Sequence, residues 1–297
     1  MHGAGVVDAK FMNVCLRAIS ANHLAIFALA AYAGCCSQAS GQGGTNAPSI
    51  TPGAIVPVFS RVNTIQPGEW VSIYGVNLAS STTIWNGIFT TSLGGASVTI
   101  NGKSAYLSYA SPTQINLQAP DDSTTGMVPV VVSNTGGNAS STVTLAQFGP
   151  SFSLFDTTHV AGIILRPDGT GTQGGGAYDI LGPTGNSLGY PTVAAKPGDI
   201  VEIFGVGFGP TSPAVTVGQV FSGAAPAVNP INLLINGVQV TPLFVGLSSA
   251  GLYQINLTIP PGLGTGDLAL VAGMGGVQTP AGTVISLAAP LPASTPR

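Results

Sequence analysis

The sequence predicts an all-β protein made of two tandem β-sandwiches. Composition is the first observation, because only 6% of the 297 residues are charged while 44% are hydrophobic. Ordinary globular domains have about 25% charged residues, so few charged side chains are left here to cover the solvent face of helices. The 42 glycines and 23 prolines suit turns between short strands, and the apolar content is high enough to form a core.

A repeated segment is the second observation. Pro67–Leu78, with the sequence PGEWVSIYGVNL, returns 130 residues later as Pro197–Phe208, with the sequence PGDIVEIFGVGF. In each copy a Pro-Gly turn and an acidic residue precede alternating apolar side chains, and a glycine ends the run. This pattern is typical of a short strand, and its recurrence indicates two domains of similar architecture.

Residues 1–39 have the order of a secretory signal and processed N-terminus. Lys10 and Arg17 precede the apolar run Leu24–Ala33, and small residues follow it. A membrane-spanning helix needs about 20 apolar residues, twice the length of this run. Translation from Met12 is an alternative to translation from Met1, since it gives a leader of more usual length.

The cleavage site has three candidates. Cleavage after Ala33 or Ala39 gives a soluble product, whereas cleavage before Cys35 gives a lipoprotein with the lipid on that thiol. The three cysteines, at positions 15, 35 and 36, all precede the expected domains, so no disulfide within a domain is expected. Residues 40–53, rich in Gly, Ser, Thr and Pro, are expected to form a linker.

Residues 54–149 should form the first sandwich from seven or so short strands. Asn101-Gly102 between alternating apolar residues is the strongest hairpin signal, because both turn positions favour positive φ. Pro57 places the first strand at a sheet edge. The expected segments are strands at 54–60 and 70–74, a hairpin at 96–107, and strands at 114–119, 128–133 and 141–146. This number and spacing of strands are typical of an immunoglobulin-like sandwich.

Residues 150–288 should form the second sandwich. Asn236-Gly237 repeats the hairpin signal and Gln254–Pro260 repeats the strand Gln114–Pro120. The offset between the copies grows by steps of five residues, which places insertions between strands, where added length costs little. Residues 150–195, with strands expected near 160–165 and 177–181, should supply the leading edge that 54–61 supplies in the first copy. A last strand is expected at 283–287, and residues 289–297 should form a flexible tail.

The order of these motifs resembles a known family. Pro-Gly-x-x-Val-x-Ile-x-Gly, Ile-Asn-Gly and Gln-Ile-Asn-x-x-x-Pro occur twice, joined by a Pro-x-Phe-x-Leu-Phe segment. This arrangement is similar to a family of exported bacterial proteins known from Solibacter-type acidobacteria, whose repeats resemble TIG/IPT immunoglobulin-like domains. The resemblance covers Pro52–Leu287 and implies a fold and an exported location, with no catalytic residues to transfer. The second copy has Gly207-Phe208 where the first has Asn77-Leu78, so the resemblance does not determine the shape of the loop that follows.

Two segments suggest catalysis, but structural explanations are stronger. Gly205–Gly209 follows a strand like a dinucleotide-binding loop, yet Pro210 replaces the last glycine and no helix follows, so a strand-end turn is the better interpretation. Gly246–Ala250 resembles a nucleophile elbow without its final glycine. A serine hydrolase would also need His159, the one histidine beyond the leader.

Carboxylates are the next candidates. Asp121-Asp122 and the trio Asp156, Asp168 and Asp179 could offer oxygen ligands to calcium, although no EF-hand spacing exists and turns explain them better. A glycosidase needs a facing pair of carboxylates, and the spacing selects none. Glu69 and Glu202 are interpreted as solvent-side strand residues.

Two aromatic residues lie in the long loop of the first domain. Trp85 and Phe89 could form a platform for a sugar or partner. A loop folded back over its own sandwich explains them as well.

The predicted function is a non-catalytic exported protein without cofactor or metal, acting as an adhesion, matrix or spacer module at the cell surface or outside the cell. Its partner would be an extracellular protein or a polysaccharide. A secreted carbohydrate-binding or carbohydrate-active protein is the alternative. Nucleic acid is excluded, because the basic residues beyond the leader are few and scattered. They are Arg61, Lys103, Arg166, Lys196 and Arg297.

Overall fold

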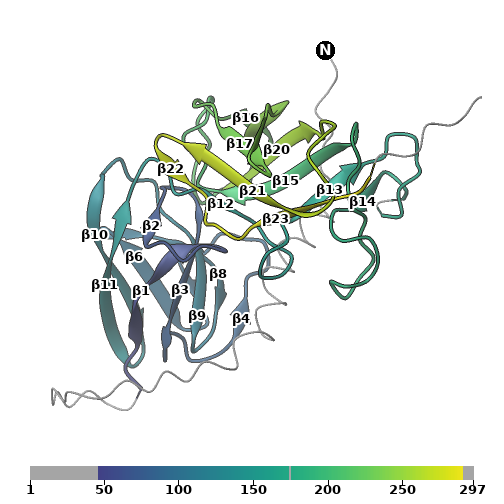
Figure 1. Cartoon of the computed structure of the whole chain (residues 1–297). Coiled ribbons are helices and arrows are strands. Elements are labelled where there is room, and N and C mark those ends of the chain that lie inside the picture. Colours follow the sequence, from purple (N-terminus) through teal and green to yellow (C-terminus); the bar gives the residue numbers. More distant parts are fainter. Residues whose placement is uncertain (1–45, 174, 290–297) are drawn as a thin grey trace, which may run out of the picture.

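Every regular element of the described chain is a β-strand (Figure 1). The computed structural model describes residues 46–173 and 175–289. Within them the strands form four sheets, two before residue 149 and two after it, so the predicted all-β class is confirmed. The described residues contain no helix long and apolar enough to cross a membrane. The expected signal segment, Cys35 and nearly all of the expected tail lie outside the described residues.

The first sandwich consists of β1–β11. One sheet has the strand order β1-β3-β9-β8-β4, and the other has the order β2-β11-β10-β6-β5, with β7 beside β6. Ile73, Leu117, Val130 and Val143 are among the fully buried residues of its core. The strands are β1 Ser49–Pro57, β2 Thr64–Ile65, β3 Trp70–Val76, β4 Thr83–Ile84, β5 Ser92–Leu93, β6 Ala96–Ile100, β7 Lys103–Ser104, β8 Tyr106–Ala110, β9 Gln114–Gln118, β10 Gly126–Asn134 and β11 Gly137–Leu145.

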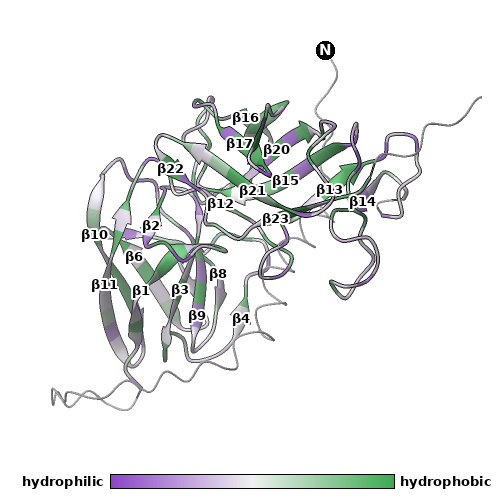
Figure 2. Cartoon of the chain, in the orientation of Figure 1, coloured by the Kyte–Doolittle hydropathy of each residue, from purple (hydrophilic) through white to green (hydrophobic). Residues whose placement is uncertain are grey.

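The second sandwich consists of β12–β23. Its larger sheet has the order β14-β13-β15-β20-β19-β16 with β12 beside β15, and its smaller sheet has the order β18-β17-β21-β22 with β23 beside β21. A separate apolar core lies between them, and hydrophobic residues recur along the strands of both sandwiches (Figure 2). The strands are β12 Ser151–Phe152, β13 Gly162–Leu165, β14 Tyr178–Ile180, β15 Ile200–Val206, β16 Ser222–Pro226, β17 Asn232–Ile235, β18 Val238–Val240, β19 Phe244–Ser249, β20 Leu252–Thr258, β21 Gly266–Met274, β22 Val277–Gln278 and β23 Val284–Leu287.

The two repeated motifs form the central strand pair of each sandwich, in the same register. The facing residues are Ile73 with Ile115 and Ser72 with Asn116 in the first, and Ile203 with Ile255 and Glu202 with Asn256 in the second. The side chain of Gln114 donates to Asn116 Oδ1 at 2.8 Å, and that of Gln254 donates to Asn256 Oδ1 at 2.9 Å. Residues two apart lie on the same face of a strand, which explains the Gln-Ile-Asn spacing.

Both Asn-Gly turns have the backbone that the hairpin prediction requires. The φ angles are 50° and 75° at Asn101 and Gly102, and 51° and 76° at Asn236 and Gly237, all in the left-handed region. They join β6 to β7 and β17 to β18. The first hairpin is shorter than predicted, because the chain leaves it after Ser104 and β8 pairs with β9 in the opposite sheet.

β12, β13 and β14 of the leading segment pair with the larger sheet of the second sandwich. β12 pairs with the end of β15 and β13 with its beginning, just as the two ends of β1 pair with β3. β14 adds a further strand outside β13. β1 lies at a sheet edge, as Pro57 indicated, but it begins at Ser49, inside the expected linker. The division into domains at residues 149 and 150 stays a prediction.

The prediction that Glu69 and Glu202 face solvent is wrong. Their exposed fractions are 1% and 6%. Glu202 shares the outer face of its sheet with Phe204, and Ile163 and Leu252 pack with Phe204 in a small apolar cluster there. Glu202 lies on the outer face of its sheet, but Ile163 of the leading segment packs over that face.

Burial of Glu202 should make stability depend on pH. Desolvation raises the pKa of Glu202 to about 7, and the Asn256 amide, 3.4 Å from Oε1, opposes the shift only in part. The folded chain therefore holds this proton where the unfolded chain, with a pKa near 4.5, releases it, and stability falls as pH rises between these values. Glu202→Gln should lessen the fall in stability by roughly 3 kcal/mol, as measured by urea unfolding across this range.

Asp168→Asn, in an exposed turn, is the control and should leave the fall in stability unchanged. An equal fall in wild type and Glu202→Gln would contradict the assignment.

Candidate functional site

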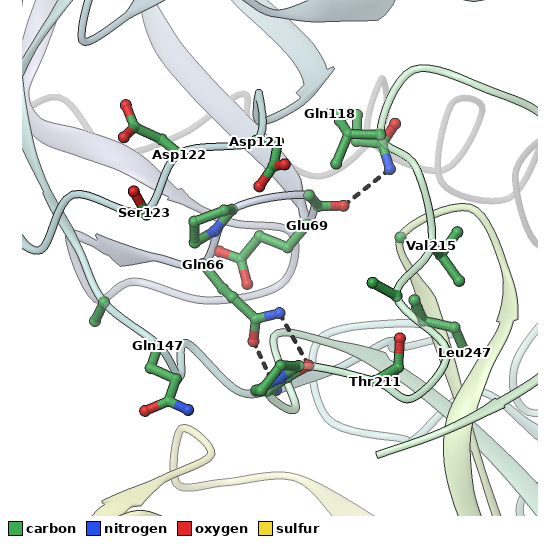
Figure 3. Close-up of a pocket in the computed structure, with 18 of the residues that line it drawn as sticks. Gln66, Glu69, Gln118, Asp121, Asp122, Ser123, Gln147, Thr211, Val215 and Leu247 are labelled. Carbon is green, nitrogen blue, oxygen red and sulfur yellow. Dashed lines mark hydrogen bonds between the residues drawn. The ribbon is translucent and has the colours of Figure 1, made fainter. Parts of the chain in front are cut away.

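A cleft of about 410 Å³ lies where the two sandwiches meet (Figure 3). The first sandwich contributes the turn before β3, the end of β9 and the segments next to β10 and β11. The second contributes the loop after β15 and residues around the β19–β20 turn. The lining residues are Gln66, Pro67, Gly68, Glu69, Gln118, Asp121, Asp122, Ser123, Thr124, Thr125, Ala146, Gln147, Gly209, Pro210, Thr211, Ala214, Val215, Val217, Leu247, Gly251 and Tyr253.

Gln66 connects the two sandwiches through the backbone of Gly209. Its Oε1 accepts the Gly209 N–H at 2.6 Å and its Nε2 donates to the Gly209 carbonyl at 3.1 Å. The hydroxyl of Tyr253 donates to the same carbonyl, and burial raises the pKa of Tyr253 to about 12. Both backbone polar groups of Gly209 are therefore satisfied by side chains rather than by a strand ladder.

Trp70 and Gln118 add two further connections. Trp70 Nε1 donates to the carbonyl of Ala250 at 2.8 Å. Gln118 Nε2 donates to Gly68 O at 2.9 Å and its Oε1 accepts the N–H of Gly218 at 3.0 Å. All of these are hydrogen bonds between a side chain and a backbone atom. They therefore fix the position of the two sandwiches relative to each other as well as holding them together.

Glu69 lies at the junction with neither carboxyl oxygen hydrogen-bonded. Burial raises its pKa well above the usual value, and the backbone amide of Gln66 opposes this only in part. A Cβ on Gly207 would collide with Glu69 Oε2 and with the Gly149 carbonyl, so Gly207, whose φ is 75°, has to be glycine. In the close-up view the Glu69 side chain points into the space between Asp121 and Gln66 (Figure 3).

Asp121 and Asp122 lie on the first-sandwich side of the cleft. Asp122 accepts hydrogen bonds from the Thr124 backbone and the Asn101 side chain and lies 3.5 Å from Lys103 Nζ. These contacts outweigh desolvation and lower the pKa of Asp122 to about 2. The side chain of Asp121 is exposed at the rim, while its backbone carbonyl accepts from Lys103 at 2.8 Å.

Trp85 and Phe89 do not line the cleft. They pack with Trp70 in one cluster, with ring centroids 5.6 Å apart for Trp85 and 6.2 Å for Phe89. Phe89 also meets the edge of Tyr106. These contacts favour the alternative explanation, in which the loop folds back over its own sandwich. Both rings are half-buried, and their role toward a ligand stays a prediction.

His159 forms no catalytic triad with serine. Its Nδ1 lies 2.8 Å from Asp156 Oδ2, and its Nε2 lies 3.3 Å from Asp267 Oδ2. Ser286 donates to Asp267 rather than to the ring. Burial disfavours the charged ring, but the two carboxylates outweigh it and raise the pKa of His159. The arrangement is an ion-paired link between the leading segment and β21.

The acidic residues considered for calcium occupy separate places. Asp156 accepts a hydrogen bond from the backbone N–H of His159, and Asp168 accepts one from the hydroxyl of Thr170. Asp179 forms an ion pair with Arg166 at 3.0 Å. Arg166 also contacts Asp199 at 2.9 Å. Among the described residues no group of three or more His, Cys, Asp or Glu could hold a metal ion.

The sequence points to Glu69, Asp121 and Asp122 of this cleft, but not to the polar residues that join the two sandwiches there. Gln66, Gln118 and Tyr253 carry no motif of their own, and their partners are distant in sequence. One available signal was that Glu69 and Trp70 differ in size or polarity from their counterparts in the second copy, Asp199 and Ile200.

The IPT/TIG domain family matches residues 54–148. The chain therefore contains a TIG domain, which coincides with most of the first sandwich, and the immunoglobulin-like fold follows. No curated protein matches the chain.

Solved structures with a similar arrangement are distant. SGBP-B of a mixed-linkage glucan utilization locus from Bacteroides ovatus, in complex with a mixed-linkage heptasaccharide, is 13% identical over 82% of this chain and 46% of that one, with a TM-score of 0.33. SGBP-B of a xyloglucan utilization locus in Bacteroides uniformis is 16% identical over 80% and 49%, with a TM-score of 0.19. A tandem pair of immunoglobulin domains from titin is 10% identical over 82% and 98%, with a TM-score of 0.21. The chain spans less than half the length of either Bacteroides protein, and TM-scores this low support no functional inference.

Trp70 should stabilise the chain more than Trp85, which lies in the same cluster but whose indole makes no hydrogen bond among the residues that the structure describes. Trp70→Phe removes the donor to Ala250 and leaves a buried carbonyl unpaired, which costs about 1 kcal/mol beyond the change in ring size. Trp85→Phe is the matched control, because its ring lies in the same cluster. Urea unfolding of both variants measures the difference. Equal losses would mean that the junction bond contributes nothing.

Proposed function

We propose that this chain, with its TIG domain at residues 54–148, is an exported, non-catalytic protein that acts as an adhesion, matrix or spacer module at the cell surface or outside the cell. Its leader-like N-terminus supports export. Cys35 is the proposed lipid attachment site if cleavage occurs before it. The proposed partner is an extracellular protein or a polysaccharide.

The side-chain hydrogen bonds across the junction are the observation that carries this proposal. Gln66, Trp70 and Gln118 each bond to backbone atoms of the second sandwich. Two sandwiches joined in this way hold one relative orientation, whereas a spacer joined only by a linker would bend. A fixed orientation also keeps the cleft formed before any ligand arrives, which reduces the entropy lost on binding.

Surface exposure is the direct test of this role. Brief protease treatment of intact producing cells, followed by mass spectrometry, should release peptides from residues 46–289. Analysis of the N-terminal peptide of the purified protein then identifies the cleavage site and any lipid on Cys35. Cells from which the gene is deleted should lose attachment or surface-layer cohesion, and a copy with the signal segment removed should not restore it. Recovery of the chain only from inside intact cells would contradict the proposal.

Polysaccharide binding is the second candidate, favoured by the hydroxyl side chains among the residues that line the cleft. Ser123, Thr124 and Thr125 are exposed there, and Thr211 of the other sandwich also lines the cleft. Hydroxyl and carboxylate groups of this kind suit the hydrogen bonding of a neutral glycan.

Retention on immobilised polysaccharides separates these possibilities. Thr211→Val should weaken retention several-fold if the cleft binds the glycan, whereas Trp85→Ala should do so if the aromatic loop binds it. Release of reducing ends that Glu69→Gln abolishes would instead identify an enzyme. Unchanged retention in both binding variants would exclude both surfaces.

A further inference from the structure

The cleft concentrates acidic side chains in a chain that has few. The whole sequence contains ten Asp and Glu residues, and Glu69, Asp121 and Asp122 all line this cleft. None of its described lining residues is Lys, Arg or His. The nearest basic group is Lys103, whose Nζ lies against the Asp121 carbonyl and the Asp122 carboxylate. Acidic side chains therefore outnumber basic ones around the cleft.

Two of the three carboxyls lack a partner. Asp122 is satisfied by Asn101, Thr124 and Lys103. The side chain of Asp121, in contrast, is exposed at the rim, and no hydrogen bond to its carboxylate is present among the described residues. Glu69 is 1% exposed, and both of its oxygens are buried without a partner. A buried polar group of this kind costs stability unless something compensates for it.

The chemistry of the lining selects among ligand classes. Anions are disfavoured by the carboxyls. A divalent cation prefers six or more oxygen ligands, and no described group of three acidic or histidine residues could hold a metal. A neutral polyol would leave the exposed Asp121 carboxyl without a counter-charge. A primary ammonium supplies one compact positive charge and three donors.

The opposite wall of the cleft suits an apolar stem. Val215 and Val217 are half-buried, and Leu247 is 8% exposed. These side chains come from the loop after β15 and from β19 of the second sandwich, whereas the acids come from the first. The cleft is thus apolar on one side and acidic on the other, which matches a side chain whose carbon stem ends in a charge.

We propose that the cleft binds a lysine side chain presented by a partner protein, with the stem against Val215 and Val217 and the ammonium balanced by Asp121 and Glu69. This deepens the binding role proposed above and rests on it. The ammonium arrives protonated, and the Glu69 carboxyl releases its proton to solvent as the ion pair forms, so the net change is one proton released per side chain bound. Contact is not required for this effect, since an opposite charge within about 4–6 Å favours the ionised carboxyl.

Proton release couples affinity to pH. The titratable groups around Glu69 are Asp121 and Asp122 after β9, Lys103 beside them, and Tyr253 on β20, whose pKa of about 12 keeps it neutral. Hydrogen bonds from Thr124 and Asn101 lower the pKa of Asp122 to about 2, so that carboxyl is ionised throughout this range. Affinity for the ammonium should therefore increase as the pH rises, by up to tenfold for each pH unit as long as the pH is below the Glu69 pKa. Glu69 is the group responsible.

The test uses the full chain and Nα-acetyl-lysine methylamide as the probe, titrated by NMR between about pH 5 and 7. The probe should shift resonances of residues 118–125 and 210–217, and Nα-acetyl-norleucine methylamide, which has the stem without the charge, should bind at least about tenfold more weakly. Glu69→Gln should abolish the pH dependence, and Asp121→Asn should weaken binding several-fold at every pH. Asp168→Asn, away from the cleft, should behave as wild type.

Several results would overturn the inference. These are equal binding of the charged and neutral probes, an unchanged pH dependence in Glu69→Gln, or no binding at all to a chain whose NMR spectrum shows it folded. Cadaverine binding as tightly as the lysine probe would replace the protein side chain by a free polyamine, and Ca²⁺ displacing the probe would replace it by a metal. If the chain is on the cell surface and supports attachment while the probe does not bind, this inference fails and the proposed function stands. If the probe binds but the chain is found only inside cells, the proposed function fails.

Discussion

The antiparallel pair of a Pro-Gly strand and a Gln-Ile-Asn strand is the interaction on which both sandwiches depend. β3 with β9 and β15 with β20 lie inside their sheets and carry fully buried residues such as Val71, Ile73, Val201 and Ile203 on the core side. All three cysteines precede the described residues, so cohesion there comes from packing and strand ladders rather than from covalent bridges. The other strands of the same sheets are placed by reference to these pairs, because the register of the central ladder decides which side chains of its neighbours face the core.

The junction obeys a different rule, since it is held by polar side chains on backbone atoms and by glycines that allow close approach. Gly251 has a φ of 67° and a Cβ there would lie 2.7 Å from Gly68 O, while the ring of Tyr106 occupies the space where Gly218 would carry a Cβ. Apolar packing alone tolerates small sliding movements. Hydrogen bonds from Gln66, Trp70 and Gln118 to specific peptide groups do not, so they convert a contact between two cores into a defined angle between them.

Much of the fold could be predicted from the sequence, and the reasons differ by element. Asn101-Gly102 and Asn236-Gly237 were predictable because a local backbone requirement decides them. The role of residues 150–195 followed from the repeat. The start of β1 at Ser49 was missed because Gly and Pro suggested a linker, although its pairing with β3 overrides that preference. Glu69 and Glu202 were misplaced because alternation tells which face a residue occupies and not what covers that face. The cleft could not be predicted, since its walls come from separate sandwiches and contain no motif.

The two copies differ most where they touch, and this difference locates the site. By the register of the repeats, Gln66, Glu69, Trp70 and Gln118 correspond to Lys196, Asp199, Ile200 and Thr258. In the second copy the residues at these positions make different contacts. Asp199 pairs with Arg166, and Ile200 is 38% exposed. A carboxyl after the Pro-Gly turn is therefore compatible with an ion pair in this fold, yet the first copy buries its carboxyl at the junction without one. The scaffold does not impose that arrangement. It exists because a second sandwich closes over the first, so the cleft and its acidic wall are properties of the pair.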